Sequence, residues 1–396
     1  MRVYKPSGIE WLGEIPQHWE VTKFKYFYRS NMGETILTQD LETDGIPVYS
    51  ATEEDKFFGK IKNPVNILNV NDFVIPARGN SIGAIKIVKE KSTCTQTTIF
   101  SKQFKDINPY YVYYFLLGYR KFLFEFIQTA IPQITISQVN ENPIILPPLQ
   151  EQKEIAEFLD SKCEKIQNYI DKKQKLITLL QEKKQALINK VVTKGLNPNI
   201  ESKNSGIEYL GLIPHHWEVR RMKFMASIHN GREQTEIADE NGIYPIYGSG
   251  GILGKSMYFI YDKPSVLLGR KGTIDKPLFV EEPFWTIDTM FYTSISKIVL
   301  PKYFYYLCLT IDFQFYISGS AIPSMTQYDL ANISFALPPL QEQKQIANFL
   351  DEKCEKINSA IEKTKRQIEL IKEYKNTLIN EAVCGRINFL EGILNE

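Results

Sequence analysis

Two arginines lie where a strand-like run meets a glycine. Arg78 follows the run 74–77, and Arg270 follows the run 266–269. An arginine carried on a turn between two strands can project deeply, and its fork of donors matches guanine O6 and N7 or a phosphate. We interpret both turns as candidate nucleic-acid contacts, with an ordinary hairpin turn as the alternative.

Small polar side chains accompany each arginine in two further segments. In chain order they are Tyr49, Ser50, Gln133, Thr135 and Ser137 in the first half and Tyr247, Ser249, Ser324, Thr326 and Gln327 in the second. Glutamine, serine and threonine can read adenine edges or hold phosphates. A Ser or Thr that directly precedes a helix is often its cap, so that alternative stays open.

Motifs for catalysis are missing from the sequence. It contains no GxGxxG or P-loop opening a βαβ unit, no HExxH and no Cys/His ligand spacing. Asn108-Pro109-Tyr110 lacks the second proline of the adenine-methyltransferase motif, and the acidic residues form no nuclease cluster. His18 and His216 each precede a tryptophan, which favours a structural role. We expect no catalytic residues, no metal site and no cofactor in this chain.

The segments that must position these residues occur twice in the sequence, as an internal repeat. Residues 7–26 and 205–224 match at 13 of 20 positions, and residues 146–166 and 337–357 match at 18 of 21. Such self-similarity indicates a duplicated architecture.

The middles of the two copies, residues 27–145 and 225–336, differ in sequence. Both are rich in aromatic and β-branched residues with Gly and Pro between them, which predicts short strands. Neutral drift would scatter differences over the whole repeat, whereas here they are concentrated. The pattern favours a shared frame that carries two different recognition surfaces.

A long helix is predicted after each middle. In the first copy it runs from Gln150 to about Val192, after Pro147-Pro148 and before Gly195. About 43 residues at 1.5 Å each give a rod of roughly 65 Å. The helices are nearly neutral in charge, so their outer faces are better suited to binding protein than DNA, with a solvated charged face as the alternative.

Both helices carry an apolar seam with the four–three spacing of a coiled coil. Its members are Ala156, Leu159, Cys163, Ile166, Ile170, Ile177, Leu180, Leu187 and Val191, and in the second copy Ala347, Leu350, Cys354, Ile357, Ile361, Ile368, Ile371, Leu378 and Ala382. We expect the two helices to pack antiparallel, with the cysteines as small core residues. The seams are interrupted at Lys173, Lys184, Thr364 and Lys375, which either fix the register or extend to solvent.

Composition limits the class of protein. The 396 residues are 43% hydrophobic and 23% charged, with 47 Lys plus Arg against 46 Asp plus Glu. That balance excludes a polycationic nucleic-acid coat and a strongly acidic mimic, but not a DNA reader with local basic loops. No apolar run approaches a membrane span. The lack of an apolar signal segment and the five cysteines without CxxC fit a soluble cytoplasmic protein.

The SGIEWLGEIPQHWE lead-in, the LPPLQEQKEIAEFLD helix start and their recurrence resemble the specificity subunit of a type I restriction–modification system. The resemblance covers essentially the whole chain. It implies an α+β fold in which two target-recognition domains, residues 1–145 and 200–336, alternate with helical spacers, residues 146–199 and 337–396. In that family the spacers pair antiparallel with pseudo-twofold symmetry.

The resemblance also implies partners and contact residues. Each recognition domain would read one half of a split, asymmetric sequence in double-stranded DNA, and the helices would set the spacing and dock two modification subunits. Those subunits would carry S-adenosylmethionine, and restriction subunits would add ATP-driven cleavage. The family's contact loops correspond to Tyr49, Ser50, Arg78, Asn80, Gln133 and Thr135, and to Tyr247, Ser249, Arg270, Lys271, Ser324, Thr326 and Gln327. The alternative is a duplicated coiled-coil scaffold whose middles bind proteins.

Overall fold

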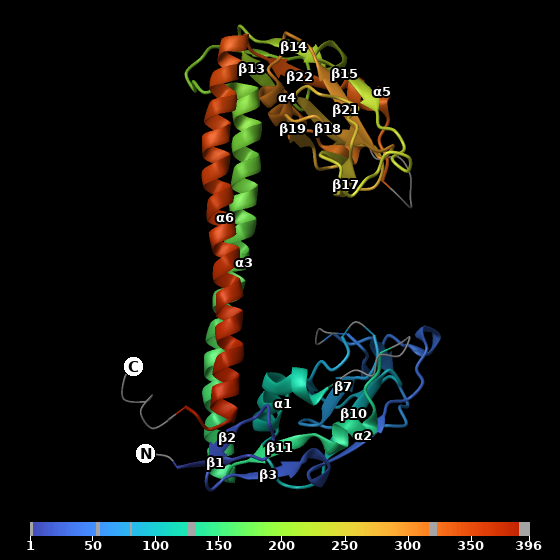
Figure 1. Ribbon diagram of the computed structural model, residues 1–396, viewed down its shortest axis with the longest axis vertical. Helices are drawn as coiled ribbons and strands as arrows, with labels where there is room; N and C mark the ends of the chain where they lie inside the picture. The colour runs from blue at the N-terminus through green and yellow to red at the C-terminus, as the bar shows by residue number, and fades with distance from the viewer. Residues whose placement is uncertain (1–2, 53–55, 80, 125–131, 317–322, 388–396) are drawn as a thin grey trace. The chain divides into compact units, whose positions relative to one another are not determined.

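The computed structural model describes residues 3–52, 56–79, 81–124, 132–316 and 323–387. The chain divides into two compact units: the first unit contains residues 1–173 and 366–396, and the second contains residues 174–365. Each unit combines one β-rich domain with part of each of two long helices (Figure 1). The predicted α+β class, two β-rich domains alternating with long helices, is confirmed.

The two long helices are α3, Leu149–Lys194, and α6, Leu340–Val383. Each is followed by a glycine in the left-handed conformation, Gly195 at φ +72° and Gly385 at φ +71°. This conformation ends a helix, and glycine adopts it with the least strain. In the described part of the chain, no helix is both long enough and apolar enough to cross a membrane.

Within each unit, the start of one long helix shares a core with the end of the other. In the first unit, Ile155 of α3 and Ile379 of α6 belong to one apolar cluster. In the second unit, Ile188 of α3 and Ile346 of α6 do so. The helix segments within each unit therefore run antiparallel, as predicted from the seam (Figure 1).

A four-stranded and a three-stranded sheet form the β-rich domain of the first unit. Across the larger sheet the order is β4 (Tyr28–Met32), β10 (Thr98–Gln103), β7 (Phe73–Pro76) and β8 (Lys86–Ile87), and across the smaller one β6 (Gly59–Ile61), β5 (Ile46–Tyr49) and β9 (Thr93–Cys94). Neighbouring strands are antiparallel, except that β5 and β9 are parallel. Helix α1, Pro109–Leu123, packs on the larger sheet and shares its core, with Phe115 and Ile75 both fully buried.

The β-rich domain of the second unit repeats this topology. The larger sheet has the order β15 (Ala226–Asn230), β21 (Met290–Ile295), β18 (Ser265–Gly269) and β19 (Leu278–Val280), and the smaller one β17 (Gly251–Ser256), β16 (Tyr244–Gly248) and β20 (Trp285–Thr286). Again only the pair in the smaller sheet, β16 with β20, is parallel. The two middles therefore differ in sequence but keep one strand order, which supports the prediction of a shared frame.

Short elements join each β-rich domain to the long helices. The strand pairs are β1 (Tyr4–Pro6) with β2 (Glu14–Pro16), β3 (Glu20–Lys23) with β11 (Pro143–Leu146), β12 (Ser202–Asn204) with β13 (Leu212–Pro214), and β14 (Glu218–Arg221) with β22 (Ser334–Leu337). The short helices are α2 (Ile136–Glu141), α4 (Pro301–Cys308) and α5 (Gln327–Asn332), with 3-10 turns at Phe24–Tyr26, Thr38–Asp40, Met222–Phe224 and Phe313–Tyr316. Strands β11 and β22 lead directly into α3 and α6.

A tryptophan in each repeated lead-in binds the first turn of the following long helix. The Trp19 indole is fully buried, and its Nε1 donates to Glu151 Oε2 at 3.1 Å. His18 Nε2 lies 2.7 Å from the other oxygen of that carboxylate. Trp217 and Glu342 repeat the contact in the second unit at 3.1 Å. The structural interpretation of the His-Trp pairs is confirmed.

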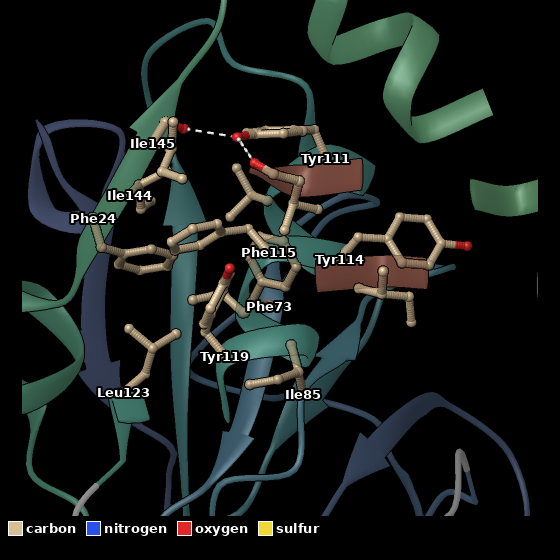
Figure 2. Packing of buried hydrophobic residues seen from close by; sticks show 14 of the residues in the cluster. Phe24, Phe73, Ile85, Tyr111, Tyr114, Phe115, Tyr119, Leu123, Ile144 and Ile145 are labelled. Carbon is tan, nitrogen blue, oxygen red and sulfur yellow. Dashed lines mark hydrogen bonds between the residues drawn. The ribbon is translucent and has the colours of Figure 1, made fainter. Parts of the chain in front are cut away.

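A buried tyrosine in each unit fixes the strand that leads into one long helix and the end of the other. The Tyr111 hydroxyl oxygen lies 3.0 Å from Ile145 O, as Figure 2 shows, and 3.3 Å from Val383 O. In the second unit the Tyr303 hydroxyl lies 3.1 Å from Ala336 O. Burial raises the pKa of both tyrosines well above the ordinary value, so both remain proton donors.

Candidate nucleic-acid interface

The predicted seam residues of α3 and α6 all lie on buried or half-buried faces of their helices. Of the polar interruptions, Lys184 donates from Nζ to Asn358 Oδ1 on the other helix at 2.9 Å. Thr364 instead donates to Ala360 O of its own helix at 2.7 Å. A role in fixing the helix register is therefore supported for Lys184, whereas Thr364 satisfies its hydroxyl locally.

In the second domain, the turn formed by Arg270 and Lys271 contacts the segment that precedes α5. Lys271 and Ser324 form an isolated antiparallel bridge. Met325 N donates to Arg270 O at 3.0 Å. Main-chain hydrogen bonds therefore bring together two of the three segments that the sequence singled out.

The third segment, after β16, reaches the same place. A Cβ at Gly272, whose φ is +81°, would lie only 3.1 Å from Ser249 Oγ. Thr289 joins the two loops, because its carbonyl accepts from Arg270 N at 2.8 Å and its hydroxyl from Ser249 N at 3.4 Å. Thr289 was not predicted from the sequence.

The Arg270-Lys271 turn and the segment at the start of α5, together with residues of β15 and β21, line a hollow of about 350 Å³. Its lining residues are Asn230, Arg270, Lys271, Phe291, Ser324, Met325, Thr326 and Gln327. Two cations and several hydrogen-bonding groups line it without a carboxylate. The Arg270 guanidinium lies 5.9 Å from the Phe291 ring centroid, and its Nη1 donates to Asp288 O at 3.2 Å. Such a hollow is suited to a phosphate or a guanine edge.

Some side chains predicted to contact DNA already form hydrogen bonds within their own domain. Thr326 caps α5 by accepting from Asp329 N at 3.1 Å, and Thr135 caps α2 by accepting from Gln138 N at 3.2 Å. The Gln327 side chain donates to a main-chain carbonyl of β15. The capping alternative considered from the sequence is confirmed for both threonines.

The first domain brings its own predicted segments together in the same way. Arg78 and Gln133 form an isolated antiparallel bridge. Ile134 N donates to Ala77 O at 2.9 Å, and Ala77 N donates to Thr97 O at 2.9 Å. The Arg-Gly turn therefore lies between the segment before α2 and the loop after β9.

The hydrogen bonds align the two domains position by position. Ala77 N donates to Thr97 O, as Arg270 N does to Thr289 O. Ala77 O accepts from Ile134 N, as Arg270 O does from Met325 N. Arg78 therefore corresponds to Lys271, not to Arg270. Although both turns carry an arginine, the two arginines occupy different positions: the counterpart of Arg270 is the buried Ala77, only 1% exposed.

The two predicted tyrosines lie at equivalent positions at or next to the ends of their strands, but they differ in exposure. Tyr49 is 2% exposed and belongs to an apolar cluster of the first domain. Tyr247 is half-buried and lies edge-on to Phe284, with ring centroids 6.2 Å apart. Burial raises the pKa of Tyr247 above the ordinary value. The prediction that Tyr49 contacts DNA is corrected, because a ring this deeply buried cannot reach a ligand outside the domain.

Ser50, directly after β5, is half-buried and accepts from Thr95 Oγ1 at 3.4 Å. Thr95 Oγ1 lies 2.8 Å from Thr97 Oγ1, so the loop after β9 links Ser50 to the Arg78 turn. The predicted contact Asn80 lies outside the described residues. Thr95 and Thr97, like Thr289, were missed because no local pattern distinguishes them.

No group of three metal-ligating side chains occurs among the residues that the structure describes. The five cysteines are free and buried. Burial raises the pKa of Cys94 to about 12, which keeps this thiol protonated and unreactive. Cys163 and Cys354 lie in the cores where the long helices pack.

Comparison with known proteins yields a family match over most of the chain. The model of the type I restriction modification DNA specificity domain matches twice, at residues 16–181 and 214–370. The two matches correspond to the two repeats of the sequence.

Individual relatives agree with the family match. The MjaVIII specificity subunit of a type I restriction enzyme from Methanocaldococcus jannaschii is 26% identical over 98% of this chain and 97% of its own length. The EcoDI specificity subunit of Escherichia coli is 22% identical over 45% of this chain and 40% of its own. A solved chain from work on complex assembly and conformational transition of the type I R-M system has a TM-score of 0.71, with 13% identity, and covers 94% of this chain and 99% of that one. That structure supports the fold.

Proposed function

Because this chain belongs to the family of type I restriction–modification DNA specificity proteins, we propose that its two β-rich domains each read one half of a split DNA target. The observation that carries the proposal is the repeated meeting of three loops. In each domain, the turn that carries a basic residue pairs with the segment before a short helix. Arg78 pairs with Gln133 in the first domain, and Lys271 pairs with Ser324 in the second. We place the two recognition domains at residues 1–145 and 200–336.

The side chains at these equivalent positions support an asymmetric target. Arginine presents a fork to guanine, whereas lysine presents a single ammonium. Glutamine can bind adenine with two hydrogen bonds, whereas serine is less selective. With Arg78 and Gln133 in one domain and Lys271 and Ser324 in the other, the two half-sites differ.

The outer faces of the long helices support docking of two modification subunits. Leu179 is 51% exposed and Leu370 is 48% exposed, and the two are equivalent in the repeat. Leu176 and Tyr374 lie close to them in sequence and are 40% and 54% exposed. The first unit contains one of these apolar pairs and the second unit the other, which fits one partner for each unit.

In this proposal, partner subunits carry out the catalytic reactions. Modification subunits would bind S-adenosylmethionine and methylate adenine, and restriction subunits would use ATP, while this chain acts in the cytoplasm as a noncatalytic subunit. Its net charge of +1 supports the division of labour. Phosphate contacts usually supply much of the affinity for DNA, so a neutral reader needs basic partners around the duplex.

The proposal is tested by expressing the full chain with its modification subunits and mapping methylated adenines across a genome. We expect methylation at a two-part motif. Arg78→Ala should relax base selection in one half of the motif and Lys271→Ala in the other, so that each variant is the control for the other. Methylation without a two-part motif, or a motif that neither variant changes, would instead favour a scaffold whose middles bind protein.

A further inference from the structure

A lysine is buried beneath the predicted contact loop of the first domain. Lys86, on β8, is only 2% exposed. Its Nζ donates to Thr52 Oγ1 at 2.8 Å and to Ser50 O at 3.3 Å. It also lies 5.9 Å from the centroid of the Tyr49 ring. The ammonium therefore contacts the end of β5 and the loop that follows it.

The loop that Lys86 holds belongs to the candidate interface. Ser50 accepts from Thr95, which in turn contacts Thr97 beside the Arg78 turn. Thr52 N also donates to Ser50 O at 2.8 Å. Lys86 thus holds, from inside the domain, the loop that Thr95 and Thr97 connect to the Arg78 turn.

The second domain fills the equivalent position with an apolar side chain. Lys86 pairs with Val74 across β8 and β7, and Leu278 pairs with Leu267 across β19 and β18. Leu278 and Tyr247 both pack against the apolar cluster formed by Leu267, Val280, Phe284 and Met290. The same fold therefore accommodates a leucine at this position, although Leu278 is half-buried where Lys86 is fully buried.

Comparing Lys86 with Leu278 distinguishes the packing of the sheet from the positioning of the loop as the reason for a buried lysine. Burying an ammonium costs more free energy than burying a leucine, unless its hydrogen bonds offset the cost. Because Leu278 shows that an apolar residue suffices for packing, the packing of the sheet does not require the charge of Lys86. The hydrogen bonds to Ser50 O and Thr52 Oγ1 give that charge a role in holding the loop.

We infer that Lys86 is a positioning residue that fixes the recognition loop of the first domain and thereby sets base selection in one half-site. The inference rests on the proposed function. It deepens that function by assigning the loop's geometry to a side chain that does not itself reach DNA. The second domain has a leucine, Leu278, at the equivalent position, so its half-site should not depend on a charge there.

The test compares Lys86→Met with Leu278→Met, which places the same residue at equivalent positions of the two domains. Each full-length variant is expressed with the modification subunits, methylated adenines are mapped, and thermal unfolding is measured. The wild-type complex should discriminate against a single wrong base by about ten-fold or more. Lys86→Met should reduce that ratio several-fold in the half of the motif that Arg78→Ala also relaxes, and should leave the other half unchanged. Leu278→Met should leave the discrimination ratio unchanged in both halves of the motif.

Thr52→Val removes one partner of the ammonium at an exposed position, so it tests the loop even if Lys86→Met unfolds the domain. Relaxation of the same half-site by Thr52→Val supports the inference. An equal fall in methylation at all sites, together with a lower unfolding temperature, would assign Lys86 to stability alone and overturn it, as would unchanged discrimination. Failure of the proposed function is distinct, because the wild-type complex itself would then show no two-part motif.

Discussion

Replacing Gly385 by alanine should loosen the end of α6 from the first domain. Its φ of +71° makes any Cβ unfavourable by about 1 kcal/mol or slightly more. That Cβ would also lie 2.6 Å from Pro16 Cγ and 2.8 Å from Trp19 Cη2. Neither group can easily move, because the proline lies in β2 and the indole is fully buried. With about 1–3 kcal/mol for overpacking, the total loss of stability is about 2–4 kcal/mol.

Gly8→Ala is the matched control. Gly8 has a similar φ of +78°, but nothing lies within 4 Å of its Cβ position, so this variant measures the backbone cost alone. Thermal unfolding and amide hydrogen exchange of the last turn of α6 are measured on the full chain. We expect Gly385→Ala to lower the unfolding temperature at least twice as much as Gly8→Ala, and to speed exchange at the end of α6. Equal effects of the two variants would refute the packing argument.

Four further outcomes are expected. Arg270→Ala should cost about 1–3 kcal/mol of DNA-binding free energy and relax one base position if the side chain reads a base edge, whereas an equal loss on all sequences in a competition assay would assign it to phosphate. Tyr303→Phe should destabilise the second unit by about 1–3 kcal/mol in denaturant unfolding, because the carbonyl of Ala336 loses a buried donor. Leu179→Glu and Leu370→Glu should each halve the stoichiometry of bound modification subunit in mass photometry without changing the unfolding temperature, and full binding would contradict docking on these faces. Burial raises the pKa of Cys94 to about 12 and that of Tyr303 well above its ordinary value, so the unfolded chain loses these protons first. Stability should therefore be full below about pH 8 and fall as the pH rises from about 9 to about 12, seen as a drop in unfolding temperature.

The long helices were predictable because their signals are local. The prolines before α3, the seam spacing and Gly195 fix its start, its buried face and its end within a few residues. The matched lead-ins also indicated the role of Trp19, since a His-Trp pair that recurs before each helix is typical of a structural contact. Its partner, Glu151, lies 132 residues away and is reached only through the fold.

The candidate interface was only partly predictable. The Arg-Gly turns were visible in the sequence, but the equivalence of Arg78 with Lys271 depends on strand register, which the diverged middles conceal. Tyr49 was misassigned because its position at a strand end suggested exposure, whereas both Val48 and Tyr49 are buried. Thr289 was missed because it becomes part of the interface only through hydrogen bonds to residues 19 and 40 positions away.

The way the loops are joined explains how two domains of one chain can keep a frame and differ in their surfaces. The bonds from Ile134 N to Ala77 O and from Met325 N to Arg270 O link main-chain atoms. Such bonds tolerate almost any side chain at either position, because every residue except proline offers the same donor and acceptor. Side chains on the loops can therefore change without loss of the loop arrangement. A protein whose task is to distinguish DNA sequences gains from this separation. In the proposed function, substitutions at Arg78 or Lys271 would alter what is read while the main chain continues to hold the loops in place.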